Sequence, residues 1–357
     1  MTTPERDRTD SSTLTDNRGG RPLVSAEVVT VFAIFALTVA FIFGSRIVSP
    51  AFGTWIHVLT ITELASFLIV VAFGQGLVIL VRGLDLSVAS MITLGGVLTT
   101  MWIGSGDGVW YMIPLVLAVC FAAGLISGIG VTFLRVPPFI MTLANGLAIY
   151  SILLGYTRGS PRGDAPAVLV DFMRLDWLGL PVVTIFVIVF AVAGTLIQGW
   201  TAYGRYLHAI GNNPDAARVI GLPVRLLTAS AYGVSAMCGG WAGMMLVGYS
   251  QGATLSMGND YLLPSIAAVV IGGSSILGGK GNYAGTVGGA LLLTTIGMLI
   301  AAIGLSQGWR TIIEGAIILL ALLLLRESLY EALRMPRFGA PGKAKSDQGT
   351  DGPRAGR

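Results

Sequence analysis

The residues that come nearest to a catalytic motif form a glycine-rich tract that ends in a lysine. Residues 273–281 read G-S-S-I-L-G-G-K-G, and a glycine-rich loop before a lysine can hold nucleotide phosphates. That pattern needs glycine at position 274 and serine or threonine after the lysine, but Ser274 and Gly281 stand there. The sequence shows no strand before the tract and no recognisable acidic partner for Mg²⁺. We therefore expect that this chain does not hydrolyse ATP.

A second distinctive stretch is a polar island between two long apolar segments. Residues 203–223 read Y-G-R-Y-L-H-A-I-G-N-N-P-D-A-A-R-V-I-G-L-P. Asn213 is followed by Pro-Asp-Ala-Ala-Arg, which favours a short helix capped by Asn213. The pattern predicts a two-turn helix at the membrane surface with a small-residue face made of Ala216, Ala217 and Gly221. Such a face fits a cleft on a partner protein, and an ordinary interfacial loop explains the same residues equally well.

The framework that positions these stretches must be embedded in a membrane, because the chain is far more apolar than a soluble domain. Hydrophobic residues make up 54% of the 357 positions and charged residues 11%, against roughly 25% charged in soluble domains. About ten segments have the ~20 apolar residues that cross a bilayer. They lie near residues 24–44, 58–81, 86–104, 110–134, 138–157, 178–199, 227–249, 263–279, 283–304 and 309–325. We expect an all-α, polytopic membrane protein with about ten transmembrane helices.

Lysine and arginine predict how these helices are oriented. Most of the 22 Lys and Arg residues fall on the same side as the two chain ends, which places both termini in the cytoplasm. Much of this excess lies in the polar stretches 1–22 and 331–357, whose composition predicts disordered tails. The membrane domain then covers residues 23–330 and carries a cytoplasmic loop at 201–226. The net charge of +4 follows from this topology and gives no reason to expect a nucleic-acid partner.

Glycine marks the places where helices are expected to pack closely or to break. The 49 glycines are about twice the average usage, and small residues let membrane helices approach one another. Closely spaced glycines around Lys280 predict a helix break near the membrane surface. The expected hinge and packing positions are Gly83, Gly272, Gly273, Gly278, Gly279 and Gly281. Cys120 and Cys238 fall inside apolar segments and are expected to be packing residues, not a disulfide.

Polar residues in or beside the apolar segments are candidates for a substrate path. The joint between the second and third predicted helices places Asp85 where a helix would start, with Ser87 next to it, so Asp85 is either a buried cap or a path residue. The remaining candidates are Gln75 and Asn145 within the spans, Gln251, Asn259, Asp260 and Tyr261 at the outer mouth, and Glu63 and Glu314 near outward helix ends. For Gln75 and Asn145, hydrogen bonding between helices is the stronger explanation.

Three motifs on these joints and on the polar island follow one another along the chain. They read G-L-D-L-S-V at 83–88, A-I-G-N-N-P-D-A-A-R-V-I-G-L at 209–222, and V-I-G-G-S-S-I-L-G-G-K-G-N-Y-A-G-T-V-G-G-A at 270–290. Together they resemble the permease subunit of ribose-type sugar ABC importers, over about residues 25–330. The D-A-A-x-x-x-G run is also similar to the E-A-A…G signature of ABC importer permeases, with Asp215 in place of Glu. The family commonly has glycine where Arg82 stands.

The resemblance implies a transport subunit of the bacterial cytoplasmic (inner) membrane with no catalytic and no metal site of its own. Its implied partners are membrane lipid, a second permease copy in a homodimer, a periplasmic or lipid-anchored sugar-binding protein, and an ABC ATPase. The ATPase would bind ATP–Mg²⁺, so no cofactor is expected in this chain. Residues 212–221 would form the coupling helix. The expected ATPase-coupling residues are Gly211, Asn212, Asp215, Ala216, Ala217, Arg218 and Gly221.

Three alternatives remain open at this point. ABC permeases for branched-chain amino acids or nucleosides share the joint around Asp85, although Asp85 together with the later Gly-Gly-Ser-Ser run favours sugars. A secondary transporter driven by H⁺ or Na⁺ would need membrane-embedded acids, and the central helix sections are almost free of charge. A membrane enzyme would need histidines and acids clustered at one surface, whereas the two histidines, His57 and His208, are predicted on opposite sides.

Overall fold

The computed structural model describes residues 26–47, 50, 52–104 and 111–306, and single positions between 308 and 319. The predicted tails, most of the predicted span 309–325 and Glu314 lie outside the described residues. The residues that surround both predicted joints and the whole polar island are described, so the positions of the three motifs can be compared directly.

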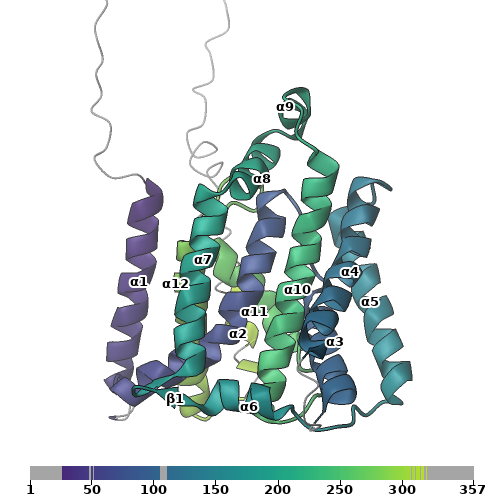
Figure 1. The fold of residues 1–357 in the computed structure, drawn as a ribbon. Helices are drawn as coiled ribbons and strands as arrows, with labels where there is room; N and C mark the ends of the chain where they lie inside the picture. Colours follow the sequence, from purple (N-terminus) through teal and green to yellow (C-terminus); the bar gives the residue numbers. More distant parts are fainter. Residues whose placement is uncertain are drawn as a thin grey trace, which may run out of the picture.

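The described chain is a bundle of helices (Figure 1). Its helices are α1 (Ala26–Gly44), α2 (Trp55–Leu80), α3 (Val88–Leu98), α4 (Met112–Thr132), α5 (Pro138–Thr157), α6 (Ala167–Arg174), α7 (Val182–Trp200), α8 (Ala202–Asn212), α9 (Pro214–Val219), α10 (Val224–Ser250), α11 (Asn259–Ile271) and α12 (Tyr283–Ala302). A 3-10 turn, η1 (Ser45–Ile47), follows α1, and a π-helical turn, η2 (Thr99–Ile103), extends α3. Two short strands, β1 (Asp176–Trp177) and β2 (Leu180–Pro181), pair antiparallel with Asp176 opposite Pro181.

Length and composition show which of these helices could cross a membrane. Six are long and apolar enough to cross a membrane, namely α1, α2, α4, α5, α7 and α12, and the shorter apolar helices are α3 with η2, and α11. Helix α10 has 27 residues, but its many glycines, alanines and serines make it less apolar than those six. Each predicted span except the last therefore contains one of these helices, and the expected all-α polytopic fold is confirmed.

Two predicted boundaries are wrong. The predicted span 263–279 is shifted, because α11 begins at Asn259 and ends at Ile271. The chain leaves the helix there because Gly273, Gly278 and Gly279 have φ angles of 88°, 81° and 76°, a region that glycine enters without a steric cost. The predicted break near Lys280 is thus confirmed. The connection between the predicted spans 138–157 and 178–199 contains a helix of its own, α6.

Helix α10 lies at the centre of the bundle, against α2, α3 and α4. Small residues make this position possible. A Cβ atom added at Gly74 of α2 would lie 2.5 Å from the Cα atom of Ser235, and one added at Gly95 of α3 would lie 2.5 Å from the Cα atom of Gly240. Backbones that meet this closely leave no room for a larger side chain. Cys120 and Cys238 are buried and not disulfide-bonded, as expected of packing residues.

The bundle has two different ends (Figure 1). Helices α8 and α9 lie at one end, called the α9 end below, and the 201–226 stretch that forms them is the predicted polar loop. Helix α6 and the β1–β2 hairpin lie at the opposite end, called the α6 end. The segment between α2 and α3, residues 82–87, is not helical and is called the joint segment.

Candidate functional site

At the α9 end, residues from the second and third sequence motifs meet the stretch of chain that comes just before the first motif. The Nε atom of Arg82 donates a hydrogen bond to the carbonyl oxygen of Gly211 at 2.6 Å, and its Nη2 atom donates to that of Asn212 at 2.6 Å. The backbone N–H of Gly279 donates to the carbonyl oxygen of Leu80 at 2.9 Å. These bonds join the end of α2, the end of α8 and the loop before α12. We call these five residues the three-motif cluster.

Glycine is required at two positions of this cluster. A Cβ atom at Gly211 would collide with the carbonyl oxygen of Leu80 and with the backbone N of Gly279, and it would lie 2.8 Å from the Cα atom of Gly279. A Cβ atom at Gly279 would lie 2.8 Å from the backbone N of Asn212. The two backbones are therefore in direct contact. This contact explains why glycine stands at both positions, although the sequence predicted a coupling role for Gly211 and a hinge or packing role for Gly279.

Helix α8 has two further ties to the bundle. The Nδ1–H of His208 donates to the carbonyl oxygen of Gly279 at 3.1 Å, and the hydroxyl of Tyr203 lies 3.1 Å from the Oγ atom of Ser230 on α10. Burial raises the pKa of the Tyr203 phenol, and the hydrogen bond with Ser230 opposes part of that rise. His208 was not predicted as a site residue. The sequence feature that could have pointed to His208 is its position in the helix that leads into the Gly-Asn-Asn-Pro run at 211–214.

Helix α9 begins as the sequence predicts. The side-chain oxygen of Asn213 accepts hydrogen bonds from the backbone N–H groups of Asp215 at 3.0 Å and Ala216 at 3.1 Å, which is the standard cap for free N–H groups at a helix start. Arg218 and Asp215 form an exposed ion pair at 2.6 Å. Gly221 has a φ angle of 86°, and the helix has ended before it.

The predicted small-residue face of this helix is wrong. Ala217 is only 2% exposed and packs into the hydrophobic core, whereas Ala216 and Gly221 are exposed. Beside the exposed ion pair, the apolar surface that α9 and the residue after it present consists of Ala216 with Val219 and Ile220, which are 88% and 71% exposed. The three residues are spaced i, i+3, i+4, the repeat of one helix face, so the sequence contained the signal. We call them the α9 patch.

The joint segment holds a buried carboxylate. Asp85 is 1% exposed, and its Oδ1 atom accepts hydrogen bonds from the backbone N–H of Ser87 at 3.0 Å and from the Ser87 hydroxyl. Its Oδ2 atom accepts from the hydroxyl of Ser235 on α10 at 2.8 Å. The Oγ1 atom of Thr142 on α5 accepts from the backbone N–H of Leu86 at 3.1 Å. The joint segment is thus held by side chains of two neighbouring helices.

The other predicted path residues are not brought together. Gln75 of α2 is 0% exposed, and neither polar atom of its amide has a hydrogen-bond partner in the described part of the chain. The Nδ2 atom of Asn145 donates to the carbonyl oxygen of Ala123 at 3.0 Å and to Ser127 Oγ at 2.7 Å, which links α5 to α4 as predicted. Gln251, at the end of α10, and Asn259, at the start of α11, are exposed.

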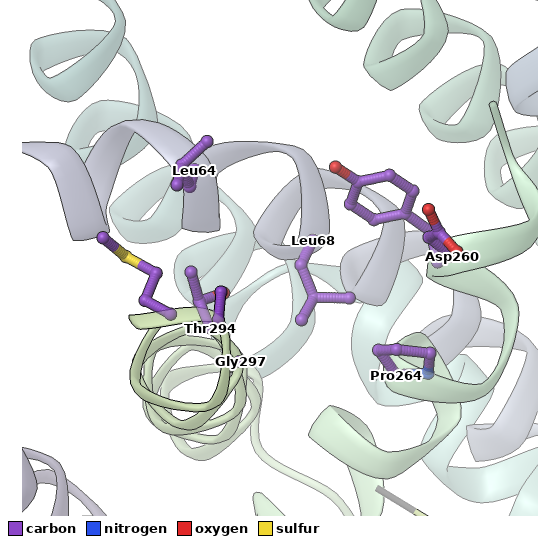
Figure 2. Close-up of a pocket in the computed structure, with 9 residues that line it drawn as sticks. Leu64, Leu68, Asp260, Pro264, Thr294 and Gly297 are labelled. Carbon is purple, nitrogen blue, oxygen red and sulfur yellow. The ribbon is translucent and has the colours of Figure 1, made fainter. Parts of the chain in front are cut away.

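A cavity of about 210 Å³ lies between α2, α11 and α12 (Figure 2). Its lining residues are Leu64, Leu68, Asp260, Tyr261, Pro264, Thr294, Gly297, Met298 and Ala301. Asp260 and Tyr261 were expected at the outer mouth of a path, and they line this cavity on the first turn of α11. The other six path candidates do not line this cavity; they are Gln75, Asp85, Ser87, Asn145, Gln251 and Asn259. Among the described residues, no group of three or more His, Cys, Asp or Glu side chains is arranged to hold a metal ion.

Comparison with known proteins places this geometry in context. Residues 57–322 match the family model described as branched-chain amino acid transport system / permease component. The chain is 33% identical over 331 residues to the probable ABC transporter permease protein y4mJ of Sinorhizobium fredii, covering 89% of this chain and 98% of that protein. It is 32% identical over 310 residues to the ribose import permease protein RbsC of Escherichia coli K12, covering 85% and 96%. It is 29% identical over 291 residues to the galactose/methyl galactoside import permease protein MglC of Haemophilus influenzae, covering 76% and 87%. No solved structure matches the chain.

Proposed function

Because this chain belongs to the family of ABC transporter permeases described as branched-chain amino acid transport system / permease component, we propose that it forms the membrane path of an ABC importer for a monosaccharide. It acts as a transport subunit, and a separate ATPase that binds ATP–Mg²⁺ supplies the energy. The observation that carries this proposal is the three-motif cluster, which joins the end of α8, directly before α9, to the bundle.

The α9 patch is the proposed docking site of the ATPase. Ala216, Val219 and Ile220 place apolar side chains on an exposed helix that stands out from the bundle (Figure 1). Exposed apolar groups gain free energy when a partner covers them. Ala217 packs into the core below them and fixes which side of α9 faces the bundle. We assign the α9 end to the cytoplasm for this reason.

The proposed cargo is a sugar of the pentose or hexose type. Several similar proteins are named for ribose or galactose import, whereas the description of the family model names branched-chain amino acids. Branched-chain amino acids are therefore the second candidate cargo. The cavity between α2, α11 and α12 offers a carboxylate, a phenol and a hydroxyl beside apolar walls. This mixture suits a molecule with many hydroxyl groups on an apolar ring.

The remaining partners belong to the same proposal. The α6 end would face the periplasm of a bacterial inner membrane and receive a binding protein there, and its β1–β2 hairpin exposes Trp177 and Leu178 at 63% and 86%. A second copy of this chain would complete the membrane path as a homodimer. Gln251 and Asn259, exposed near this end, would then lie close to the point where the sugar is delivered.

Purification of the tagged chain from its native membranes in mild detergent tests the proposal. We expect an ABC ATPase and a second permease copy to copurify in stoichiometric amounts. ATP-dependent uptake of D-ribose and D-galactose, compared with uptake of L-leucine, then identifies the cargo class. A folded chain that repeatedly purifies alone, and that moves solute in vesicles on an H⁺ or Na⁺ gradient without ATP, would replace this proposal with an ion-driven carrier.

A further inference from the structure

Arg82 ties the joint segment to the helix that leads into α9. Its guanidinium group donates to the carbonyl oxygens of Gly211 and Asn212, the last residues of α8, both at 2.6 Å. A cation at the C-terminal end of a helix is favoured by the helix dipole, and charge-assisted bonds are stronger than neutral ones. The backbone φ angle of Arg82 is 66°, a left-handed conformation that disfavours residues with a Cβ atom. The side-chain bonds offset this cost.

The rest of the joint segment is held from the membrane side. Asp85 accepts a hydrogen bond from Ser235 of α10 at 2.8 Å, and the backbone of Leu86 donates to Thr142 of α5 at 3.1 Å. At Gly83, an added Cβ atom would collide with the hydroxyl of Tyr232 on α10. The segment therefore connects α8 at one end with α10 and α5 at the other. It does so through short bonds and direct contacts.

The chain itself offers a second route from α9 into the bundle, through the turn before α10. That turn passes through Gly221, which is exposed, has a φ angle of 86° and has open space within 4 Å of an added Cβ atom. A glycine in open space can change its backbone angles at little cost. The backbone hydrogen bonds of this turn, from Gly221 to Arg218 at 3.0 Å and from Leu222 to Ala217 at 3.1 Å, stay within residues 217–222 and reach no other helix. This turn is therefore expected to yield more readily than the contacts of Arg82. Tyr203 and Ser230 link the start of α8 to α10 through one neutral hydrogen bond at 3.1 Å.

We propose that the joint segment carries the movement of α9 into the membrane, and that Arg82 is the positioning residue that connects it to α8. The proposal rests on the proposed function of α9 as the docking site for an ATPase. Arg82 touches neither sugar nor nucleotide in this account. Glycine is common at this position in the family that the sequence resembles, so the tie through Arg82 is a feature of this chain. Its loss is expected to make the coupling of ATP hydrolysis to transport less tight while leaving the parts of the complex assembled.

The variant Arg82→Gly tests this, because glycine keeps the left-handed backbone conformation without strain and removes only the side chain. Arg135→Gly is the matched control. Arg135 lies in the turn between α4 and α5, has a φ angle of 57°, is exposed, and makes no side-chain hydrogen bond among the described residues. The complex with its copurifying ATPase and binding protein is placed in vesicles, and hydrolysed ATP and accumulated D-ribose or D-galactose are counted.

We expect Arg82→Gly to raise the number of ATP molecules hydrolysed per sugar about tenfold, the effect of losing a charge-assisted bond, while Arg135→Gly keeps the wild-type ratio. Arg82→Lys, with one ammonium group for two carbonyl oxygens, should give an intermediate ratio. If Arg82→Gly lowers the thermal midpoint of the complex, Ser235→Ala tests the other end of the same segment and should raise the ratio as well.

The outcomes separate this inference from the proposed function. If no ATPase copurifies with the wild-type chain, the proposed function fails and this inference fails with it. If the wild-type complex couples ATP hydrolysis to sugar uptake but both Arg82→Gly and Ser235→Ala keep the wild-type ratio, the proposed function stands and the joint segment is not the route.

Discussion

The two ends of the helix bundle differ in how tightly their segments are joined. At the α9 end, hydrogen bonds of 2.6 Å connect Arg82 with residues 129 and 130 positions further along the chain, and glycine backbones touch directly. At the α6 end the contacts are uneven. A Cβ atom added at Gly248 would lie 2.5 Å from the carbonyl oxygen of Leu169, but Gly159, Gly179 and Gly252 have open space where a Cβ atom would lie. A tight end transmits force, and a looser end can adapt to a partner and to cargo. The α9 end is therefore the better candidate for energy input.

The largest predicted effect compares one glycine from each end. Gly211→Ala should destabilise the protein by ~3 kcal/mol or more, because its Cβ atom would overlap backbone atoms that cannot move aside. Gly252→Ala should change stability by less than about 0.5 kcal/mol. Unfolding of both variants in the same detergent, followed by intrinsic fluorescence against temperature, makes the comparison. Equal midpoints would remove the difference between the ends.

The second prediction separates docking from folding. Ala216→Trp should lower ATPase copurification and sugar uptake by tenfold or more, which corresponds to about 1.4 kcal/mol of docking energy, without a change in thermal midpoint. Val168→Trp, on the exposed face of α6 (49% exposed), should leave ATPase copurification unchanged. If Val168→Trp on α6 lost more copurifying ATPase than Ala216→Trp on α9, the assignment of the two ends would be reversed. Substitution of Ala217 by Asp is not equivalent, because Ala217 is buried and the variant would unfold.

The third prediction concerns α2, which connects the two ends. The buried amide of Gln75 has no hydrogen-bond partner among the described residues, and such a group costs about 1–3 kcal/mol. Gln75→Leu should therefore raise the free energy of unfolding by a similar amount. We expect D-ribose uptake to fall in the same variant if the amide is retained for the substrate path. A lower stability would show that the amide is paired in the membrane.

The smallest effect is expected at the α6 end. With its amide oxygen facing Arg174, Gln251 accepts a hydrogen bond from Nη2 of Arg174 at 2.9 Å. Arg174→Ala should change stability by less than about 0.5 kcal/mol, as for other surface contacts. Chemical denaturation of the detergent-solubilised variant measures this. A loss comparable to that of Gly211→Ala would show that the α6 end is held as tightly as the α9 end.

Local sequence signals predicted the helices and their ends well. Asn213 before Pro214 identified the start of α9, since a side-chain cap and a fixed proline φ act within one turn. The lengths of the apolar segments identified the spans, and glycines near Lys280 identified a break. These features depend on neighbouring residues alone, so a single sequence contains them.

Contacts between distant segments could not be predicted in this way. The hydrogen bond from Arg82 to Gly211 depends on how α2 and α8 pack. The residues around Arg82 and those around Gly211 contain no pattern that predicts this contact. The burial of Ala217 depends on which side of α9 meets α10, so the small residues were assigned to one face incorrectly. Gln251 and Asn259 were expected at an outer mouth and are exposed, whereas the packing of α2, α11 and α12 decides that Asp260 and Tyr261 line the cavity.

Site-directed cross-linking tests the central claim, that α9 docks an ATPase, most directly. Cys120 and Cys238 are buried, so Ala216→Cys provides one accessible thiol on α9 and Val168→Cys provides one on α6. Native membranes carrying either variant are treated with a maleimide that carries a photoreactive benzophenone, which inserts into C–H bonds of a neighbouring protein on irradiation. The linked proteins are identified by mass spectrometry. The account predicts an ABC ATPase linked to position 216 and none linked to position 168. An ATPase linked to position 168 and absent from position 216 would contradict it.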